Sequence, residues 1–419
     1  MDNNKAFVCR LKNITPIEGA DKIVQAQVFL NGIPITQVVV GVDTKEDTPV
    51  VYFDSNLCLS DRLIADYPDL AVYLAKSNRV RCIKLRGVIS NGLCVDLTKF
   101  AKYTAVEMPE GYAFDSIGDV EICHKYVPVK MEPTARHGSK ERKAKKPSRI
   151  IPEMFRFHVD TEQLPRNVHK LHLNDVISIS RKVHGTSAIV SHTQVRKFPT
   201  VREKIAKAIG IHIEDREWDY LYSSRSVIKN DALTPGFYKY DLWTETGKKY
   251  FGGKLHKGET VYYEIVGYLP GTKTFIQKNY DYGTLPGDCS IAVYRITSTN
   301  PDGVVLEYSW AAMRERCKEM GVPIVQEYYY GRVTDFLHAF DIASTPEWAS
   351  NLLAVLKRVY LEQDCPDNLC KKMPDEGIVL RVEAKDIQVY KYKSEKFLTH
   401  ESKAKEDEVI DIEEQEGAI

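Results

Sequence analysis

The sequence has no net charge, no long hydrophobic run and no closely spaced pair of cysteines. Its 58 Lys and Arg residues balance its 58 Asp and Glu residues, which argues against a protein that coats nucleic acid over its whole surface but permits local basic patches. No stretch approaches the length needed to span a bilayer, and the first residues lack the apolar segment of a secretory signal. We therefore expect no membrane association.

The nine cysteines include no C-x-x-C pair, and Cys365 and Cys370 lie too far apart for the usual zinc-knuckle spacing. This pattern is typical of reduced thiols, so we expect an intracellular protein of the cytoplasm or nucleus. A length of 419 residues with 43% hydrophobic content indicates a globular chain of two or three domains.

The first block, residues 1–128, contains short β-like runs separated by turn residues. Strands are expected at residues 23–30, 37–42 and 50–53, and one helix after Ser60. Several short strands with a single helix indicate a small OB-type β-barrel, a fold that often binds nucleic acid on one face. A basic cluster here is either solvated surface or part of a nucleic-acid-binding face, and it consists of Arg79, Arg81, Lys84 and Arg86.

Two polar segments flank the remaining sequence. Residues 129–150 are rich in Pro, Gly, Ser and basic residues, which predicts a linker whose basic run at 142–146 is a spacer, an RNA contact or a nuclear signal. Residues 401–419 become increasingly acidic and predict a tail that frays as a charged helix or coil. The main domain is expected between them, at residues 151–400.

The first candidate site residue is a lysine at the end of an expected strand. Residues 177–181 indicate a strand that ends at Lys182, Gly185 allows a sharp turn, and a second strand begins at Thr186. Lys182 would then lie at the mouth of a hairpin. A lysine attacks phosphorus only when it is unprotonated, so burial, neighbouring cations or a metal must lower its pKa. The alternative is an ordinary solvated lysine.

Other strands carry side chains that suit a nucleotide site. Glu264 lies in the apolar run 262–267, where a carboxylate needs a ribose hydroxyl, a metal-bound water or a basic residue as partner. Tyr294, in the run 290–296, either stacks on a purine or belongs to the core. Glu376 precedes another strand, where a carboxylate can bind a hydrated metal.

Lys391 and Lys393 are two residues apart in the run 389–393, so strand geometry points both to one face. Two neighbouring ammonium groups suit a bound phosphate, although lysines on an exposed edge strand also protect against aggregation.

The order of six segments is the most informative feature. A lysine nucleophile, an arginine, two carboxylates, an aromatic ring and a Lys-x-Lys pair in one order are what lysyl-AMP chemistry requires. The segments are residues 182–185, 223–225, 264–267, 292–294, 376–379 and 391–393. This set resembles the covalent nucleotidyltransferase superfamily of RNA ligases, DNA ligases and messenger RNA capping enzymes.

More closely, the chain is similar to the ATP-dependent RNA ligases with an OB module before the ligase domain. Segments 14–23 and 85–93 resemble that module, and segment 157–161 resembles the start of the catalytic domain. The resemblance implies an α+β fold, with an OB-like barrel followed by an adenylyltransferase domain built on antiparallel sheets with flanking helices. DNA ligases and capping guanylyltransferases typically have an OB domain after the Lys-x-Lys motif, and too few residues follow Lys393 for one.

The resemblance also implies roles for the site residues. Lys182 would attack the α-phosphate of ATP and carry AMP, with Gly185 in the ATP-binding set and Mg²⁺ or Mn²⁺ as the metal. Arg225 would contact the ribose and later the RNA 5′-phosphate, and Tyr294 would stack on adenine. Glu264 would bind the ribose or the water shell of the metal.

In the same way, Glu376 would hold the metal hydrate, and Lys391 and Lys393 would contact the α-phosphate. AMP would then move to an RNA 5′-phosphate, and a 3′-hydroxyl would displace it. The expected substrate is RNA, at nicks in duplexes with an RNA 3′-OH strand, and no obligate protein partner is evident.

Two residues depart from the family pattern. His184 stands where aspartate is usual, and imidazole adds no negative charge, which puts the metal preference and pH optimum in doubt. Tyr263 stands where a small glycine often precedes the motif glutamate. A catalytically inactive nucleic-acid-binding relative, with His184 as the lesion, is therefore an alternative.

Overall fold

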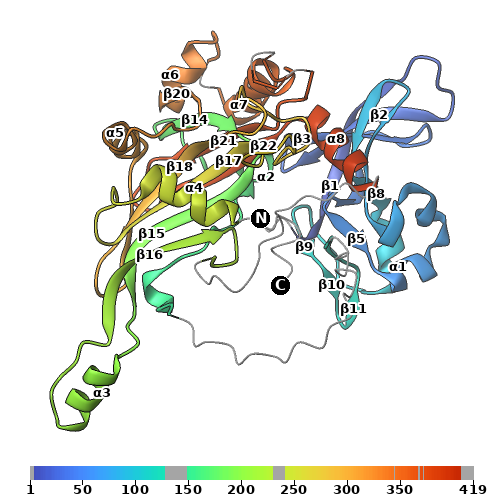
Figure 1. The fold of residues 1–419 in the computed structure, drawn as a ribbon. Coiled ribbons are helices and arrows are strands. Elements are labelled where there is room, and N and C mark those ends of the chain that lie inside the picture. The colour runs from blue at the N-terminus through green and yellow to red at the C-terminus, as the bar shows by residue number, and fades with distance from the viewer. Residues whose placement is uncertain are drawn as a thin grey trace.

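A computed structural model describes residues 4–127, 149–229, 241–343, 345–366, 369–370 and 372–406. The chain has a mixed α/β fold with an N-terminal module, residues 4–127, beside a larger two-sheet region, residues 149–406 (Figure 1). The basic run expected at 142–146 and the acidic residues 407–419 lie outside the described residues. No helix in the described part of the chain is long and apolar enough to cross a membrane.

The N-terminal module is built on a curled six-stranded sheet. The strand order is β3-β2-β1-β4-β8, with β9 added to β1. The edge strands β3 and β8 come close together, so the sheet curls toward a barrel. The strands expected at 23–30 and 50–53 are confirmed, while the OB assignment stays a prediction. The bounds are β1 Ala6–Pro16, β2 Ile23–Leu30, β3 Ile33–Gly41, β4 Thr48–Phe53, β8 Leu93–Asp96 and β9 Ala113–Phe114.

Smaller elements cover this sheet. Helix α1 (Asp61–Asp66) begins after Ser60, whose side chain accepts a hydrogen bond from the Leu63 amide, so the expected helix is confirmed. Three short pairs complete the module: β5 (Leu57–Leu59) with β12 (Cys123–Lys125), β6 (Cys82–Leu85) with β7 (Val88–Asn91), and β10 (Ser116–Ile117) with β11 (Val120–Glu121).

The two-sheet region contains two five-stranded sheets. The first has the order β13-β22-β21-β14-β20 and the second β16-β15-β17-β18-β19. All pairs are antiparallel except β13 with β22, which is parallel. The first sheet consists of β13 Glu162–Gln163, β14 Val176–Lys182, β20 Glu327–Arg332, β21 Gly377–Val382 and β22 Gln388–Lys393. The second consists of β15 Thr186–Arg196, β16 Arg216–Ser224, β17 Glu259–Gly267, β18 Cys289–Thr299 and β19 Val305–Glu307.

Helices flank both sheets, and a separate apolar core lies against each. The core of the second sheet includes Trp243 and Met313 from α4 and α5, and that of the first includes Phe336 and Leu352 from α6 and α7. The helices are α2 Leu164–Asn167, α3 Val201–Ala208, α4 Leu242–Phe251, α5 Trp310–Met320, α6 Val333–His338, α7 Trp348–Leu356 and α8 Glu395–Glu406. Shorter 3₁₀ turns occur at Pro68–Tyr73, Lys76–Asn78, Leu97–Lys102, Pro152–Met154 and Val168–Lys170, with a π-helical turn at Lys357–Leu361.

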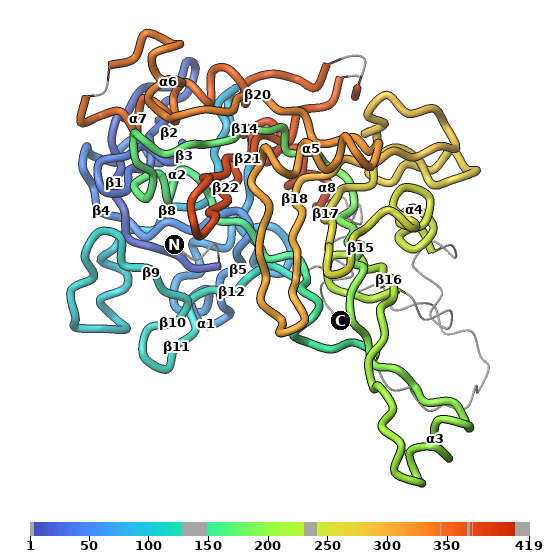
Figure 2. Tube along the Cα trace, turned by 90° about the vertical axis from the view of Figure 1, so that its left-hand side faces the viewer, coloured from blue at the N-terminus to red at the C-terminus, as the bar shows by residue number. Residues whose placement is uncertain are grey.

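The prediction of a hairpin around Lys182 is wrong, although both of its expected strands are present. Strand β14 pairs with β20 and β21, whereas β15 pairs with β16 and β17. The chain therefore crosses from one sheet to the other over residues 183–185 (Figure 2). Local strand pattern does not encode which partner a strand takes, and here longer-range pairs replace the local one. This crossing places Lys182 at the junction of the two sheets.

Helix α8 continues beyond the point where the sequence predicted a fraying tail. It runs to Glu406 and lies between the two-sheet region and the N-terminal module (Figure 1). Ser402 is buried against that module. A polar segment is thus ordered by long-range contacts that its composition does not reveal.

Candidate active site

Two cavities, of about 590 and 290 Å³, lie where the sheets meet. Lys182 and Glu264 line both of them. The larger cavity is also lined by residues of the N-terminal module, such as Asn56 and Lys125. Every residue expected to bind ATP lines one or both cavities: Lys182, Gly185, Arg225, Glu264, Tyr294, Glu376, Lys391 and Lys393.

Lys182 is held by a carboxylate. Its Nζ lies 2.8 Å from Oε1 of Glu376. Burial acts to lower the pKa of the Lys182 amine, and Lys393 acts in the same direction, but Glu376 and Glu264 outweigh them, so the pKa is raised. Burial and neighbouring cations are therefore not sufficient to lower this pKa, because the contact with Glu376 favours the ammonium form. A lower pKa through a bound metal stays a prediction.

Glu376 is the centre of this charge cluster. Its side chain is 3% exposed, and Oε1 also lies 3.4 Å from Nζ of Lys393. Burial would raise the pKa of Glu376, but Lys182, Lys393 and His184 together lower it, so the carboxylate is ionised. Oε2 is buried and has no hydrogen-bond partner among the described residues, although Nδ1 of His184 lies 3.8 Å away. This oxygen is available to a further cationic group.

Lys391 and Lys393 lie on β22, which is paired on both sides by β13 and β21. The edge-strand explanation for this pair is therefore excluded. Burial lowers the pKa of Lys391 to about 7, with further contributions from Lys393, Lys182 and Arg225. A buried amine beside three cations is a strong site for an anion.

Gly185 is needed because β17 passes very close to the crossover between sheets. A Cβ atom here would lie 2.5 Å from the carbonyl oxygen of Ile265 and 2.9 Å from Cγ1 of Val266. Gly185 does not have a left-handed φ. The expected sharp turn is therefore not the reason for a glycine at this position. The reason is the close approach of the β17 backbone, which leaves no room for a side chain.

Glu264 and Tyr263 point to opposite faces of β17, as successive strand residues do. Glu264 lines the two cavities, whereas Tyr263 is fully buried with its ring 5.0 Å from that of Phe251. The unusual tyrosine therefore belongs to the apolar core of the second sheet, away from the cavities.

Tyr294 forms a polar group with two residues that sequence reasoning did not select. Its hydroxyl lies 3.1 Å from Oγ of Ser187 and 3.3 Å from Nδ1 of His158. Burial lowers the pKa of His158 to about 3, assisted by Arg225 and Arg295, so this imidazole is neutral. The only sequence signal was that His158 lies in a segment that resembles the start of the family's catalytic domain.

Arg225 follows β16 and pairs with Asp160. Asp160 is also 3.4 Å from Nζ of Lys125 on β12 of the N-terminal module. Asp160 was not expected at the site, because its partners are 65 and 35 positions away in the sequence.

His184 occupies an aromatic pocket. Its ring meets those of Tyr280 and Phe397 edge-on, with centroids 4.8 and 5.0 Å apart. Its amide donates a 2.8 Å hydrogen bond to the hydroxyl of Tyr282. An aspartate side chain is smaller than an imidazole ring and would not fill this space. The two aromatic rings therefore suit a histidine at position 184 better than the expected aspartate.

The basic cluster of the N-terminal module does not form one exposed face. Arg79 is only 2% exposed and donates to Ser402 of α8, so its prediction as a nucleic-acid-binding residue is corrected. The guanidinium of Arg81 donates to the carbonyl oxygens of Tyr73 and Val72, at 3.1 and 3.3 Å. Lys84 and Arg86 are exposed on the β6–β7 hairpin and stay predictions.

No protein-family model and no curated protein sequence matches the chain. Solved structures of Naegleria gruberi RNA ligase do match it. An apo mutant aligns over 96% of this chain and 100% of its own, with 15% identity and a TM-score of 0.60. A mutant with ATP and Mn aligns over 94% and 98%, with 15% identity and a TM-score of 0.59.

The structure of that ligase with PPi aligns over 95% of this chain and 98% of its own, with 16% identity and a TM-score of 0.58. The match extends over both the N-terminal module and the two-sheet region. This chain therefore shares its fold with that RNA ligase.

Proposed function

We propose that this protein is an ATP-dependent RNA ligase that joins a 3′-hydroxyl end to a 5′-phosphate end through a lysyl-AMP intermediate. The observation that carries the proposal is the position of Lys182, whose amine lies between two cavities and 2.8 Å from Glu376. The fold likeness supports it, because the matched ligase structures include complexes with ATP and Mn, AMP and Mn, and PPi.

In this mechanism the smaller cavity binds adenine beside Tyr294 and neutral His158. The amine of Lys182 loses a proton and attacks the α-phosphorus of ATP, and the bond to pyrophosphate breaks. Lys391 and Lys393 stabilise the charge that develops on the phosphate oxygens. An oxygen of the RNA 5′-phosphate then displaces Lys182 from AMP, and the 3′-hydroxyl finally displaces AMP.

A divalent cation, Mg²⁺ or Mn²⁺, fits the carboxylates of Glu264 and Glu376. Oε2 of Glu376 is buried without a hydrogen-bond partner among the described residues. The described residues contain no cluster of three or more His, Cys, Asp or Glu side chains that could hold a metal ion by themselves. Few protein ligands suit a metal that keeps several waters. When bound, the cation would offset the charge of Glu376 that keeps Lys182 protonated and would withdraw charge from the α-phosphate.

The proposed substrate is RNA at a nicked duplex with an RNA 3′-OH strand, bound partly by Lys84 and Arg86 of the N-terminal module. The exposed β6–β7 hairpin that carries both residues supports this assignment. Nine free cysteines support an intracellular location, where thiols stay reduced.

The test is covalent labelling. We expect the protein with α-labelled ATP and Mg²⁺ or Mn²⁺ to form a labelled adduct that survives denaturation. Lys182→Ala should abolish it, and Lys170→Ala, which removes an exposed lysine paired with Glu162, should not. No adduct in the wild type, or label that persists in Lys182→Ala, would contradict the proposal and favour an inactive relative.

Two comparisons separate the alternatives. Labelling by GTP instead of ATP would indicate a capping guanylyltransferase. Sealing of a nick with a DNA 3′ end, but not one with an RNA 3′ end, would indicate a DNA ligase.

A further inference from the structure

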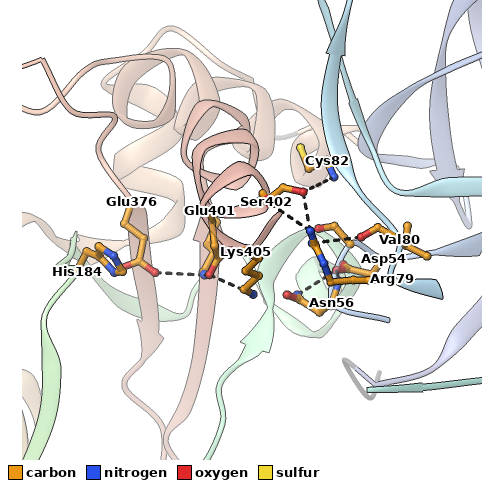
Figure 3. Close-up of polar contacts among 12 residues, drawn as sticks. Asp54, Asn56, Arg79, Val80, Cys82, His184, Glu376, Glu401, Ser402 and Lys405 are labelled. Atoms are coloured by element: carbon orange, nitrogen blue, oxygen red, sulfur yellow. Dashed lines mark hydrogen bonds and ion pairs between the residues drawn. The ribbon is translucent and has the colours of Figure 1, made fainter. Parts of the chain in front are cut away.

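The last helix, α8, connects the candidate active site to the N-terminal module. Figure 3 shows Glu401, Ser402 and Lys405 of α8 between Glu376 and His184 on one side and Arg79 on the other. Ser394, just before α8, donates its amide to the carbonyl oxygen of Glu376 at 2.9 Å and its hydroxyl to that of Asp375 at 2.7 Å. The beginning of the helix is therefore fixed to the segment that carries Glu376.

The end of α8 is fixed by Arg79 of the N-terminal module. The guanidinium donates to Oγ and to the carbonyl oxygen of Ser402, at 3.3 and 3.1 Å, and lies 3.8 Å from a carboxylate oxygen of Glu406. A cation near the carbonyl end of a helix is favourable because it offsets the negative end of the helix dipole. The amide of Cys82 also donates to Oγ of Ser402, at 3.2 Å. The last turn of α8 is thus attached to the N-terminal module.

Glu401, the residue before Ser402, contacts the Lys-x-Lys strand. Nζ of Lys393 lies 3.1 Å from Glu401 and 3.4 Å from Glu376. Burial would raise the pKa of Glu401, but Lys393 and Lys405 outweigh it and lower the pKa, so Glu401 is ionised. Because Glu401 and Ser402 are in the same helical turn, a shift of that turn moves the carboxylate that holds Lys393.

We propose that Arg79 is a positioning residue for the reaction. By holding the last turn of α8, Arg79 keeps Glu401 in place, and Glu401 holds Lys393 between two carboxylates at the α-phosphate position. The inference rests on the proposed function and adds a route by which the N-terminal module affects adenylylation of Lys182.

Single-turnover adenylylation tests this route. We expect Arg79→Ala to slow the step about tenfold, the effect of losing hydrogen bonds from a charged group, with little change in the ATP concentration for half-maximal rate, because Lys393 acts on charge that develops in the transition state. Glu401→Gln should slow it similarly. The double variant should be no slower than the slower single variant, because both act through Lys393.

Matched controls are Arg62→Ala, which removes an exposed arginine of the same module, and Lys396→Ala, which removes an exposed lysine of α8. Both should keep the wild-type rate. Multiplied losses in the double variant, or an unchanged rate in Arg79→Ala, would overturn the proposal. Arg79→Lys should restore part of the rate, which a defect in folding alone does not predict.

Hydrogen exchange provides a measurement that needs no activity. In Arg79→Ala, backbone amides of residues 399–406 and 391–393 should exchange faster, while those of β1 should not change. Ser402→Ala removes the Oγ acceptor of Arg79 without removing a charge, so it should increase the exchange rates less. It replaces Arg79→Ala in this test if that variant does not fold. Absence of an adduct in the wild type would refute the proposed function alone, whereas unchanged exchange in both variants would refute the role of Arg79.

Discussion

At the scale of single residues, the site changes the pKa of two lysines in opposite directions. Glu376 raises the pKa of Lys182 against the effect of burial, whereas burial and neighbouring cations lower the pKa of Lys391 to about 7. Near neutral pH, Lys391 is therefore the amine that loses its charge in the free protein. A bound triphosphate would restore that charge, because an anion in contact favours the ammonium form.

Binding of a non-reactive ATP analogue at pH 8 should therefore be coupled to proton uptake. The pKa of Lys391 is about 7 in the free protein and rises on binding, so uptake should be largest at pH values between the free and the bound pKa. It should vanish well below pH 7, where Lys391 is already protonated. Titration calorimetry in buffers of different ionisation enthalpy measures the number of protons. Lys391→Met should remove the uptake, and a buffer-independent enthalpy for the wild type at pH 8 would contradict this account.

Sequence alone predicted which residues gather at the site better than it predicted their state. Strand alternation and motif order selected Lys182, Glu264 and the Lys-x-Lys pair, all of which line the cavities. The burial of Arg79 and the position of His158 beside Tyr294 depend on partners far away in the sequence. Such contacts leave no local pattern, so composition and spacing could not reveal them.

At the scale of elements, the crossover between the two sheets determines where Lys182 lies. Strand pattern predicted the end of β14 at Lys182 and the start of β15 at Thr186, because β-branched runs and turn residues are local signals. It failed on their pairing, which places the two strands in different sheets. The crossover works only with a residue that lacks a side chain at position 185, where β17 approaches closely.

Gly185→Ala should therefore reduce both stability and adenylylation. The added methyl would meet the Ile265 carbonyl oxygen at 2.5 Å, and overpacking of this kind costs about 1–3 kcal/mol of the free energy of unfolding. Displacement of the crossover should also move Lys182 and slow adduct formation. Urea unfolding and single-turnover labelling measure the two effects.

The control for this substitution is Gly41→Ala at the end of β3, where a Cβ meets nothing within 4 Å and the backbone has no left-handed φ. It should leave the free energy of unfolding within about 0.5 kcal/mol of the wild-type value. Equal behaviour of the two alanine variants would mean that the close approach of β17 has no energetic effect.

At the scale of the whole molecule, buried polar contacts join the N-terminal module to the two-sheet region. Arg166 of α2 pairs with Asp54, with side chains 4% and 11% exposed, and its guanidinium lies 5.0 Å from the ring centroid of Phe7. The contact of Arg79 with α8 forms a second connection. Each contact joins residues more than 100 positions apart, so local sequence patterns could not predict this interface.

Asp54→Asn should separate the unfolding of the two regions. The substitution leaves Arg166 buried without its anionic partner, which costs about 3–5 kcal/mol, while asparagine keeps the oxygen that accepts from the Asn56 amide. All four tryptophans lie after residue 217, so their fluorescence reports only the two-sheet region, whereas far-ultraviolet circular dichroism reports the whole chain. In urea the two signals should coincide for the wild type and diverge for Asp54→Asn. Asp47→Asn, which weakens a more exposed pair with Arg10, should behave as the wild type, and coincident transitions in Asp54→Asn would show that other contacts couple the two regions.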